Sequence, residues 1–163
     1  MNFEEHFWQM KTALTLADKA YREGEVPVGC VVVDPWGKVV GKGHNLKEKF
    51  CDATLHAEMV ALKAAAKSLG SWRLMECSLY VTLEPCPMCL AAMIQFRIGR
   101  LFFGAYDSKG GGLSLGLPLH QNPKLNHRFP VVGGFLHYEC SKMMSDFFRE
   151  RRKRPDQYAK PNS

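Results

Sequence analysis

Two short stretches, His56-Ala57-Glu58 and Pro85-Cys86-Pro87-Met88-Cys89, carry most of the information about this chain. Together they supply one imidazole, two thiols and one further carboxylate. Zinc accepts nitrogen and sulfur ligands of this kind in a tetrahedral site, and three protein ligands leave the fourth position for water. An open fourth position is typical of a catalytic zinc rather than a structural one. The pattern therefore predicts a catalytic zinc held by His56, Cys86 and Cys89.

Glu58 lies two residues after His56, in the same predicted helical turn, where its carboxylate can reach that water without binding the metal. Two thiolates cancel the charge of Zn²⁺, so we expect this metal to acidify its water less than a zinc held by three imidazoles. A nearby base is then needed, and Glu58 is the candidate catalytic residue. The alternative is an ordinary acidic residue favoured in the first turn of a helix.

Two alternatives remain open for the metal. In a closed structural site a fourth side chain would replace the water, and Cys51, five residues before His56 in a polar loop, is the obvious candidate. A sulfur of Cys51 about 2.3 Å from the ion would identify such a site. The other alternative is that no metal binds, since a C-x-x-C pair alone also occurs in redox proteins.

Length and composition indicate one globular domain. A chain of 163 residues with 46% apolar residues can bury one core and is short for two. We expect a single domain over residues 1–154 and a short C-terminal tail over 155–163. No apolar run approaches the ~20 residues of a membrane span, and the first 25 residues lack the apolar block of a signal peptide. With cysteines scattered outside any disulfide-like framework, this predicts a cytoplasmic protein that contacts no membrane.

Positive charge is concentrated at the C-terminal end of the chain. The formal charge is +6, from 22 Lys and Arg against 16 Asp and Glu, and the segment from Arg149 onward holds six basic and two acidic residues. Such a segment favours a polyanionic partner, RNA or DNA before a membrane. A solvated terminal helix is the alternative.

The apolar periodicity predicts helices separated by short strands. Thr54 is a candidate N-cap for the second helix, and the glycine-rich segment 104–116 is expected to be a functional loop. This order predicts an α/β fold, a three-layer α/β/α sandwich with a five-stranded mixed sheet. Both zinc stretches lie where a helix begins, and in such folds ligands collect there. Helices are expected over residues 3–23, 55–69, 86–97 and 138–153, and strands over 26–33, 38–42, 79–83, 101–103 and 131–132.

An H-x-E followed by P-C-x-x-C is the signature of zinc deaminases that act on nucleobases. Through nearly its whole length the chain resembles the bacterial tRNA-specific adenosine deaminases, which belong to the cytidine and deoxycytidylate deaminase superfamily. The zinc stretches define only the superfamily, whereas Asn126-His127-Arg128 and Phe147-Phe148-Arg149 narrow the resemblance to the tRNA enzymes. Further matching segments are residues 24–29, 44–45, 72–74, 82–89 and 103–105, together with Asp107 and Lys109.

The resemblance implies hydrolytic deamination of adenosine to inosine at the wobble position of a tRNA anticodon, by a homodimer with one Zn²⁺ per subunit. Glu58 would move protons from the zinc-activated water to the ring nitrogen and to the departing ammonia. Asn45 would hydrogen-bond the flipped base, with Val28 and Ala57 also in the substrate-binding set. The other implied contacts to the anticodon stem-loop are Asp107, Lys109, Phe147, Phe148 and Arg149.

The residue types agree with that substrate, because bases of single-stranded RNA loops are stacked on aromatic side chains and held by basic ones. An asparagine offers both a donor and an acceptor to a base edge. Phe147 and Phe148 are nevertheless as compatible with a helix core as with stacking. Two other functions stay open: a small-molecule deaminase acting on guanine or cytosine, which needs no cationic segment, and an RNA-binding module whose zinc is structural.

Overall fold

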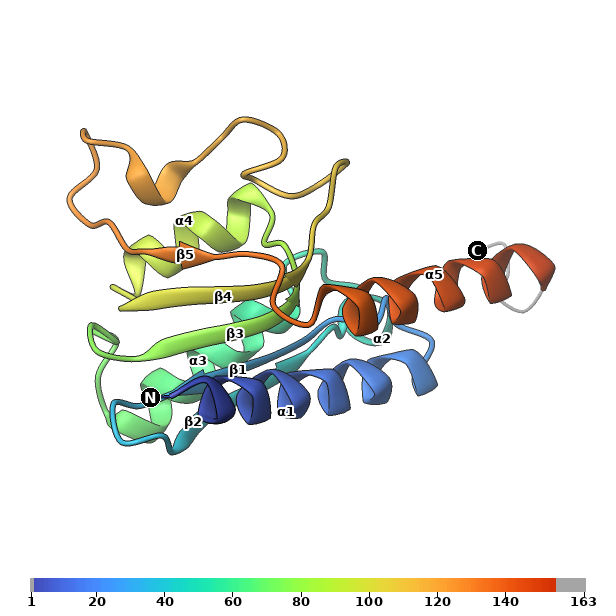
Figure 1. The fold of residues 1–163 in the computed structure, drawn as a ribbon, viewed down its shortest axis with the longest axis horizontal. Helices are drawn as coiled ribbons and strands as arrows, with labels where there is room; N and C mark the ends of the chain where they lie inside the picture. The colour runs from blue at the N-terminus through green and yellow to red at the C-terminus, as the bar shows by residue number, and fades with distance from the viewer. Residues whose placement is uncertain (1, 155–163) are drawn as a thin grey trace.

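A five-stranded mixed sheet forms the centre of the protein, and the computed structural model describes residues 2–154 around it (Figure 1). The strands are β1 (Gly29–Val33), β2 (Val39–His44), β3 (Ser78–Leu83), β4 (Arg100–Ala105) and β5 (Val131–Val132). Their order in the sheet is β2-β1-β3-β4-β5. β1 is antiparallel to β2 and β3, whereas β4 is parallel to β3 and β5. The predicted tail over 155–163 lies outside the described residues.

Helices cover both faces of this sheet (Figure 1). The helices are α1 (Phe3–Arg22), α2 (Lys47–Phe50), α3 (Ala57–Leu69), α4 (Pro87–Gln95) and α5 (His137–Lys153), with a 3₁₀ turn η1 (Leu119–Gln121). Neighbouring strand residues point to opposite faces, so Val32 packs in the core under α3 and α4 while Val31 packs in the core under α1 and α5. The predicted three-layer α/β/α sandwich is therefore confirmed. In the part of the chain that the structure describes, no helix is both long enough and apolar enough to cross a membrane.

Close packing of α3 on β2 determines where the stretch His56-Ala57-Glu58 lies in the fold. A Cβ atom on Gly43 would lie 2.2 Å from the carbonyl oxygen of Ala57, and one on Gly41 would lie 2.3 Å from that of Ala61. Only glycine at these positions allows the helix backbone to approach the strand so closely. The end of β2 and the start of α3 therefore meet at one edge of the sheet, which brings Asn45 next to the first turn of α3.

Local hydrogen bonds shift some boundaries from those predicted. Thr54 is not the N-cap of α3, because its backbone N–H and its hydroxyl both donate to Asp52 Oδ1, at 2.8 and 2.7 Å. His56 is the N-cap residue and the helix begins at Ala57. β1 begins at Gly29, three residues later than predicted, since the N–H of Val28 bonds back to the carbonyl of Val26. The segment predicted as a polar loop contains the short helix α2.

Candidate active site

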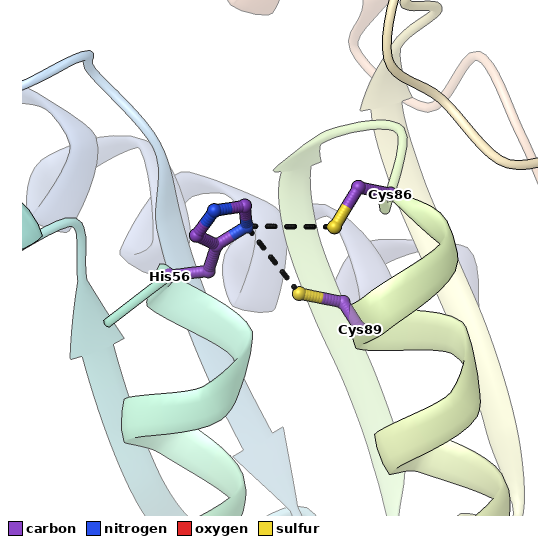
Figure 2. A group of neighbouring side chains, drawn as sticks. All are labelled: His56, Cys86 and Cys89. Atoms are coloured by element: carbon purple, nitrogen blue, oxygen red, sulfur yellow. Dashed lines mark hydrogen bonds between the residues drawn. The ribbon is translucent and has the colours of Figure 1, made fainter. Parts of the chain in front are cut away.

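His56 and Cys86 occupy equivalent places in the fold, each the residue just before the first turn of a helix. Cys86 follows β3 and Cys89 lies in the first turn of α4, so both sulfurs point from α4 toward the His56 ring (Figure 2). Pro87 occupies the start of α4, where its fixed φ suits a helix and its missing N–H would have had no helical partner. The sequence thus places the two zinc stretches face to face across the ends of two helices.

The three side chains fit a single zinc ion. His56 Nδ1 lies 3.6 Å from Cys86 Sγ and 3.5 Å from Cys89 Sγ (Figure 2). Tetrahedral zinc, with bonds of about 2.0–2.1 Å to nitrogen and about 2.3 Å to sulfur, separates such atoms by about 3.6 Å. Among residues 2–154, the only group of three or more such side chains with mutually close ligand atoms is this one, and it does not include Cys51. Cys51 is an exposed residue that caps α2, so the closed-site alternative has no support.

His56, Cys86 and Cys89 share protons through the hydrogen bonds between them, and these bonds shift their pKa values. The hydrogen bond with Cys89 lowers the pKa of Cys86 to about 4, and the same interaction raises the pKa of Cys89. The hydrogen bond with Cys86 raises the pKa of His56. Because thiolate is the form of cysteine that binds metal, a bound divalent cation would replace these shared protons.

Glu58 reaches the same site from the first turn of α3. Only 4% of it is exposed, and burial raises the pKa of its carboxyl to about 7. A carboxyl group with such a pKa can accept and give up a proton near neutral pH, which is what general acid–base catalysis requires. A cation bound beside it would favour the ionised form and lower that pKa again. The position therefore suits a proton carrier that lies next to the metal without belonging to the ligand group.

A pocket of about 200 Å³ opens onto the metal ligands and Glu58. It is smaller than the ~300–1,000 Å³ of sites for drug-sized ligands, and so suits a single ring system. Six of the predicted site residues lie on its wall: Val28, Asn45, His56, Glu58, Cys86 and Asp107. The wall also includes Val26, Lys47, Leu83, Glu84 and Gly110, which were not among the predicted site residues.

Asn45 spans the pocket wall through its side-chain amide. Its Oδ1 accepts a hydrogen bond from the N–H of Ala57 at 3.0 Å, and its Nδ2 donates to the carbonyl of Val26 at 3.1 Å. One N–H and one oxygen lone pair are left for a ligand. Ala57 is fully buried, and its backbone N–H is the hydrogen-bond partner of Asn45; its place in the substrate-binding set stays a prediction.

A larger groove of about 860 Å³ joins the pocket, because the two share Val26, Leu83, Asp107 and Gly110 as lining residues. Its other wall is α5, which protrudes from the body of the molecule (Figure 1). Three of the predicted RNA contacts line this groove rather than the pocket: Lys109, Phe148 and Arg149. The sequence prediction missed Ser145 and Arg152, although residues 145, 148, 149 and 152 follow the spacing of one helix face.

The two adjacent phenylalanines of α5 have different surroundings. Phe147 is 1% exposed and its ring packs edge-on against Tyr21 of α1, with 5.3 Å between ring centroids. Phe148 is 40% exposed and lines the groove. We therefore remove Phe147 from the predicted RNA contacts: it is a core residue, and Phe148 is the aromatic side chain available to a ligand.

A three-layer sandwich in which an H-x-E helix start faces a P-C-x-x-C helix start is the arrangement of the zinc deaminases of nucleobases. Residues 3–105 match the family model of the cytidine and deoxycytidylate deaminase zinc-binding region. The chain therefore belongs to the cytidine and deoxycytidylate deaminase family, and within it to the branch of the tRNA-specific adenosine deaminases, as the following relatives show.

The tRNA-specific adenosine deaminase of Bacillus subtilis (strain 168) is 46% identical over 145 residues, which cover 89% of each chain. That of Haemophilus influenzae is 46% identical over 143 residues, covering 88% of this chain and 83% of the relative. A solved structure from a study of A-to-I editing by tRNA:A34 deaminases at the wobble position of transfer RNA has a TM-score of 0.78 at 38% identity. The match covers 83% of this chain and 97% of that one.

Proposed function

We propose that this protein is a zinc-dependent hydrolase that converts adenosine to inosine at the wobble position of a tRNA anticodon. The observation that carries the proposal is the continuity of a base-sized pocket at the metal ligands with a groove lined by Lys109, Phe148 and Arg149. A free base needs only the pocket, whereas an RNA loop also needs the groove. The names of the relatives support the same substrate.

In the reaction, the oxygen of water bonds to C6 of adenine and the bond between C6 and the amino group breaks, releasing ammonia. His56, Cys86 and Cys89 would hold the zinc ion, which would supply the Lewis acid that lowers the pKa of the attacking water. Glu58 takes one proton of that water and gives it to the ring nitrogen, and then takes the second proton from the hydroxyl formed at C6 and gives it to the leaving amino group. Its burial keeps bulk water away from this proton transfer.

The base enters the pocket out of the anticodon loop, since bases of single-stranded loops can be extruded at low cost. Val28 supplies an apolar wall, and the free N–H and lone pair of Asn45 bond the base edge. In the groove, Phe148 stacks a neighbouring base while Lys109 and Arg149 contact phosphates. Asp107 lies where the pocket and the groove meet, so its carboxylate contacts the nucleotide backbone next to the flipped base.

The same proposal includes a homodimer in the cytoplasm. The relatives act on tRNA by name, and tRNA is processed in that compartment of a bacterium. Leu115 and Leu117 in the loop beside α4 are 47% and 48% exposed, and we propose that they lie in the dimer interface. Light scattering of the purified protein tests the dimer.

The experiment that tests the function presents anticodon stem-loops with adenosine at the wobble position or one position away, in parallel with free adenosine, guanine and cytosine. Inosine and ammonia are measured for each. We expect inosine from the wobble substrate; ammonia from guanine or cytosine with none from the stem-loop would instead identify a small-molecule deaminase.

The Glu58→Gln variant completes the experiment. It should retain zinc and stem-loop affinity while losing about 10²–10⁴-fold in turnover, the usual contribution of a positioned acid–base group. If the wild-type chain bound the stem-loop as tightly as this variant and formed no inosine, the protein would be an RNA-binding module with a structural zinc.

A further inference from the structure

Glu84 is a buried carboxylate at the junction of the metal site and the RNA groove. It is 2% exposed and lies two residues before the metal ligand Cys86. Its Oε2 accepts hydrogen bonds from the N–H of Asp107 at 3.0 Å and from the hydroxyl of Ser114 at 2.6 Å. Its Oε1 accepts from the N–H of Ser114 at 2.7 Å. Both ends of the loop over 107–114 are therefore bonded to one side chain.

The loop backbone is shaped around this carboxylate. A Cβ atom on Gly111 would lie 2.3 Å from the carboxyl carbon of Glu84, so only a glycine there lets the loop close over the side chain. Two backbone hydrogen bonds add to these contacts. The N–H of Gly112 bonds to the carbonyl of Pro85, and the N–H of Glu84 bonds to the carbonyl of Ala105. These bonds connect the loop directly to the segment that leads into α4.

The loop presents the residues that the pocket and the groove share. Asp107 and Gly110 line both, and Lys109 lines the groove. Asp107 Oδ1 accepts from the N–H groups of Lys109 and Gly110, at 3.0 and 3.1 Å, so the tip of the loop holds one shape once Asp107 is in place. The position of Asp107 is set in turn by its N–H bond to Glu84.

We infer that Glu84 is a positioning residue: its carboxylate, which is not one of the metal ligands, fixes the loop over 107–114 at the mouth of the pocket and so determines how the anticodon loop is held. The inference rests on the proposed function. According to this inference, Glu84 affects how tightly the stem-loop binds and which adenosine is selected, rather than the chemical step.

The Glu84→Gln substitution isolates this role because it conserves the size of the side chain. A carboxylate offers acceptors on both oxygens, whereas an amide offers one oxygen and one NH₂ group. The two backbone donors, from Asp107 and Ser114, bond to different oxygens. In either orientation of the amide, one of them therefore faces the NH₂ group, and an unpaired buried donor is costly enough to displace its end of the loop.

Three measurements test the inference on the zinc-loaded, full-length chain. For Glu84→Gln we expect kcat/KM on the wobble stem-loop to fall about tenfold or more, mainly through KM, which is the size of effect expected of one unpaired buried amide. Hydrogen exchange should accelerate at the amides of Asp107 and Ser114 while zinc content stays at one per chain. Inosine at an adenosine next to the wobble position should rise relative to the wobble product.

Two further variants separate positioning from general stability. Asp34→Asn makes the same chemical change at a buried carboxylate remote from the pocket, where one oxygen accepts both the Trp36 and the Lys38 N–H and the amide can still do so. It should leave KM unchanged. Ser114→Ala removes only the hydroxyl bond and should raise KM less than Glu84→Gln does.

Wild-type KM and wild-type exchange in Glu84→Gln would overturn the inference, as would an equal loss of kcat/KM in Asp34→Asn. If the wild-type chain formed no inosine, the proposed function would fail on its own. The exchange rates of the loop amides would then still decide whether Glu84 positions the loop.

Discussion

Asn45 accepts a hydrogen bond from the backbone N–H of Ala57, 3.0 Å away, and so holds the first turn of α3 against the end of β2. The same side chain donates to the carbonyl of Val26, which also lines the pocket. A residue expected to recognise the base thus also builds the wall against which the base lies. Both roles use the same amide, and substitutions can separate them.

Replacing Asn45 by alanine should lower the free energy of unfolding by about 1–3 kcal/mol, because the Ala57 N–H is left buried without a partner. Asn45→Asp keeps an acceptor for that N–H and loses the donor to Val26. We expect Asn45→Asp to be the more stable of the two in urea titrations, yet to lose deamination as Asn45→Ala does. Asn45→Ala with wild-type stability would mean that the Ala57 bond contributes nothing.

The two phenylalanines of α5 should respond in opposite ways to truncation. Phe147→Ala removes a buried ring from the contact between α5 and α1, and should cost about 3–5 kcal/mol of stability. Phe148→Ala should change stability little and weaken stem-loop binding by about 1–3 kcal/mol, the usual contribution of one stacked base. Thermal unfolding and equilibrium binding measure the two effects.

Phe148→Leu is the control for that pair, since it keeps an apolar side chain but removes the aromatic face. It should weaken stem-loop binding nearly as much as Phe148→Ala. If the leucine variant binds like the wild type, Phe148 contributes apolar contact rather than stacking.

The sequence was sufficient to predict the sheet, the layers and the three side chains that come together at the candidate zinc site, for a physical reason. His56, Cys86 and Cys89 are read from fixed local spacings at two helix starts, and the structure brings their ligand atoms within 4.8 Å of one another. Phe147 and Phe148 show the limit of such reasoning. Successive helix residues point about 100° apart. The sequence therefore indicates that only one of the two phenylalanines packs in the core, but which one depends on where α1 lies.

Glu84 and Thr54 show two other limits. A buried carboxylate has no periodic signature, and the partners of Glu84 lie 23 and 30 residues further along the chain. Thr54 fits the pattern of a helix cap, but its N–H and its hydroxyl donate to Asp52, and His56 is the N-cap residue of α3. In both cases the deciding contact is a hydrogen bond that residue type alone does not specify.

Removing zinc should destabilise the protein. Because the metal binds a site that exists only in the folded chain, stability should rise by about 1.4 kcal/mol for each tenfold increase in free zinc above the dissociation constant. Unfolding of chelator-treated protein at a series of zinc concentrations measures this slope. Cys86→Ser should reduce the affinity, whereas Cys51→Ser should leave the slope and affinity as in the wild type; weaker zinc binding in Cys51→Ser would restore the closed-site alternative.

A pH-sensitive contact lies outside the metal site, between Glu23 at the end of α1 and His44 at the end of β2. His44 Nε2 lies 3.0 Å from Glu23 Oε2, and this hydrogen bond is the main reason why the pKa of Glu23 is below its ordinary value of 4.5. A carboxyl whose pKa is lowered on folding stabilises the protein above its ordinary pKa, and that contribution is lost as the pH falls through the lowered value.

Glu23→Gln should therefore reduce the melting temperature at neutral pH, and the difference from wild type should shrink as the pH falls below about 4.5. Melting curves from pH 3 to 7 measure this difference. In a His44→Asn background the carboxyl has lost its main partner, so the pH dependence of the Glu23→Gln effect should shrink to the smaller contributions of Lys49 and Lys19. A pH-dependent effect of the same size in that background would mean that groups other than His44 lower the pKa of Glu23.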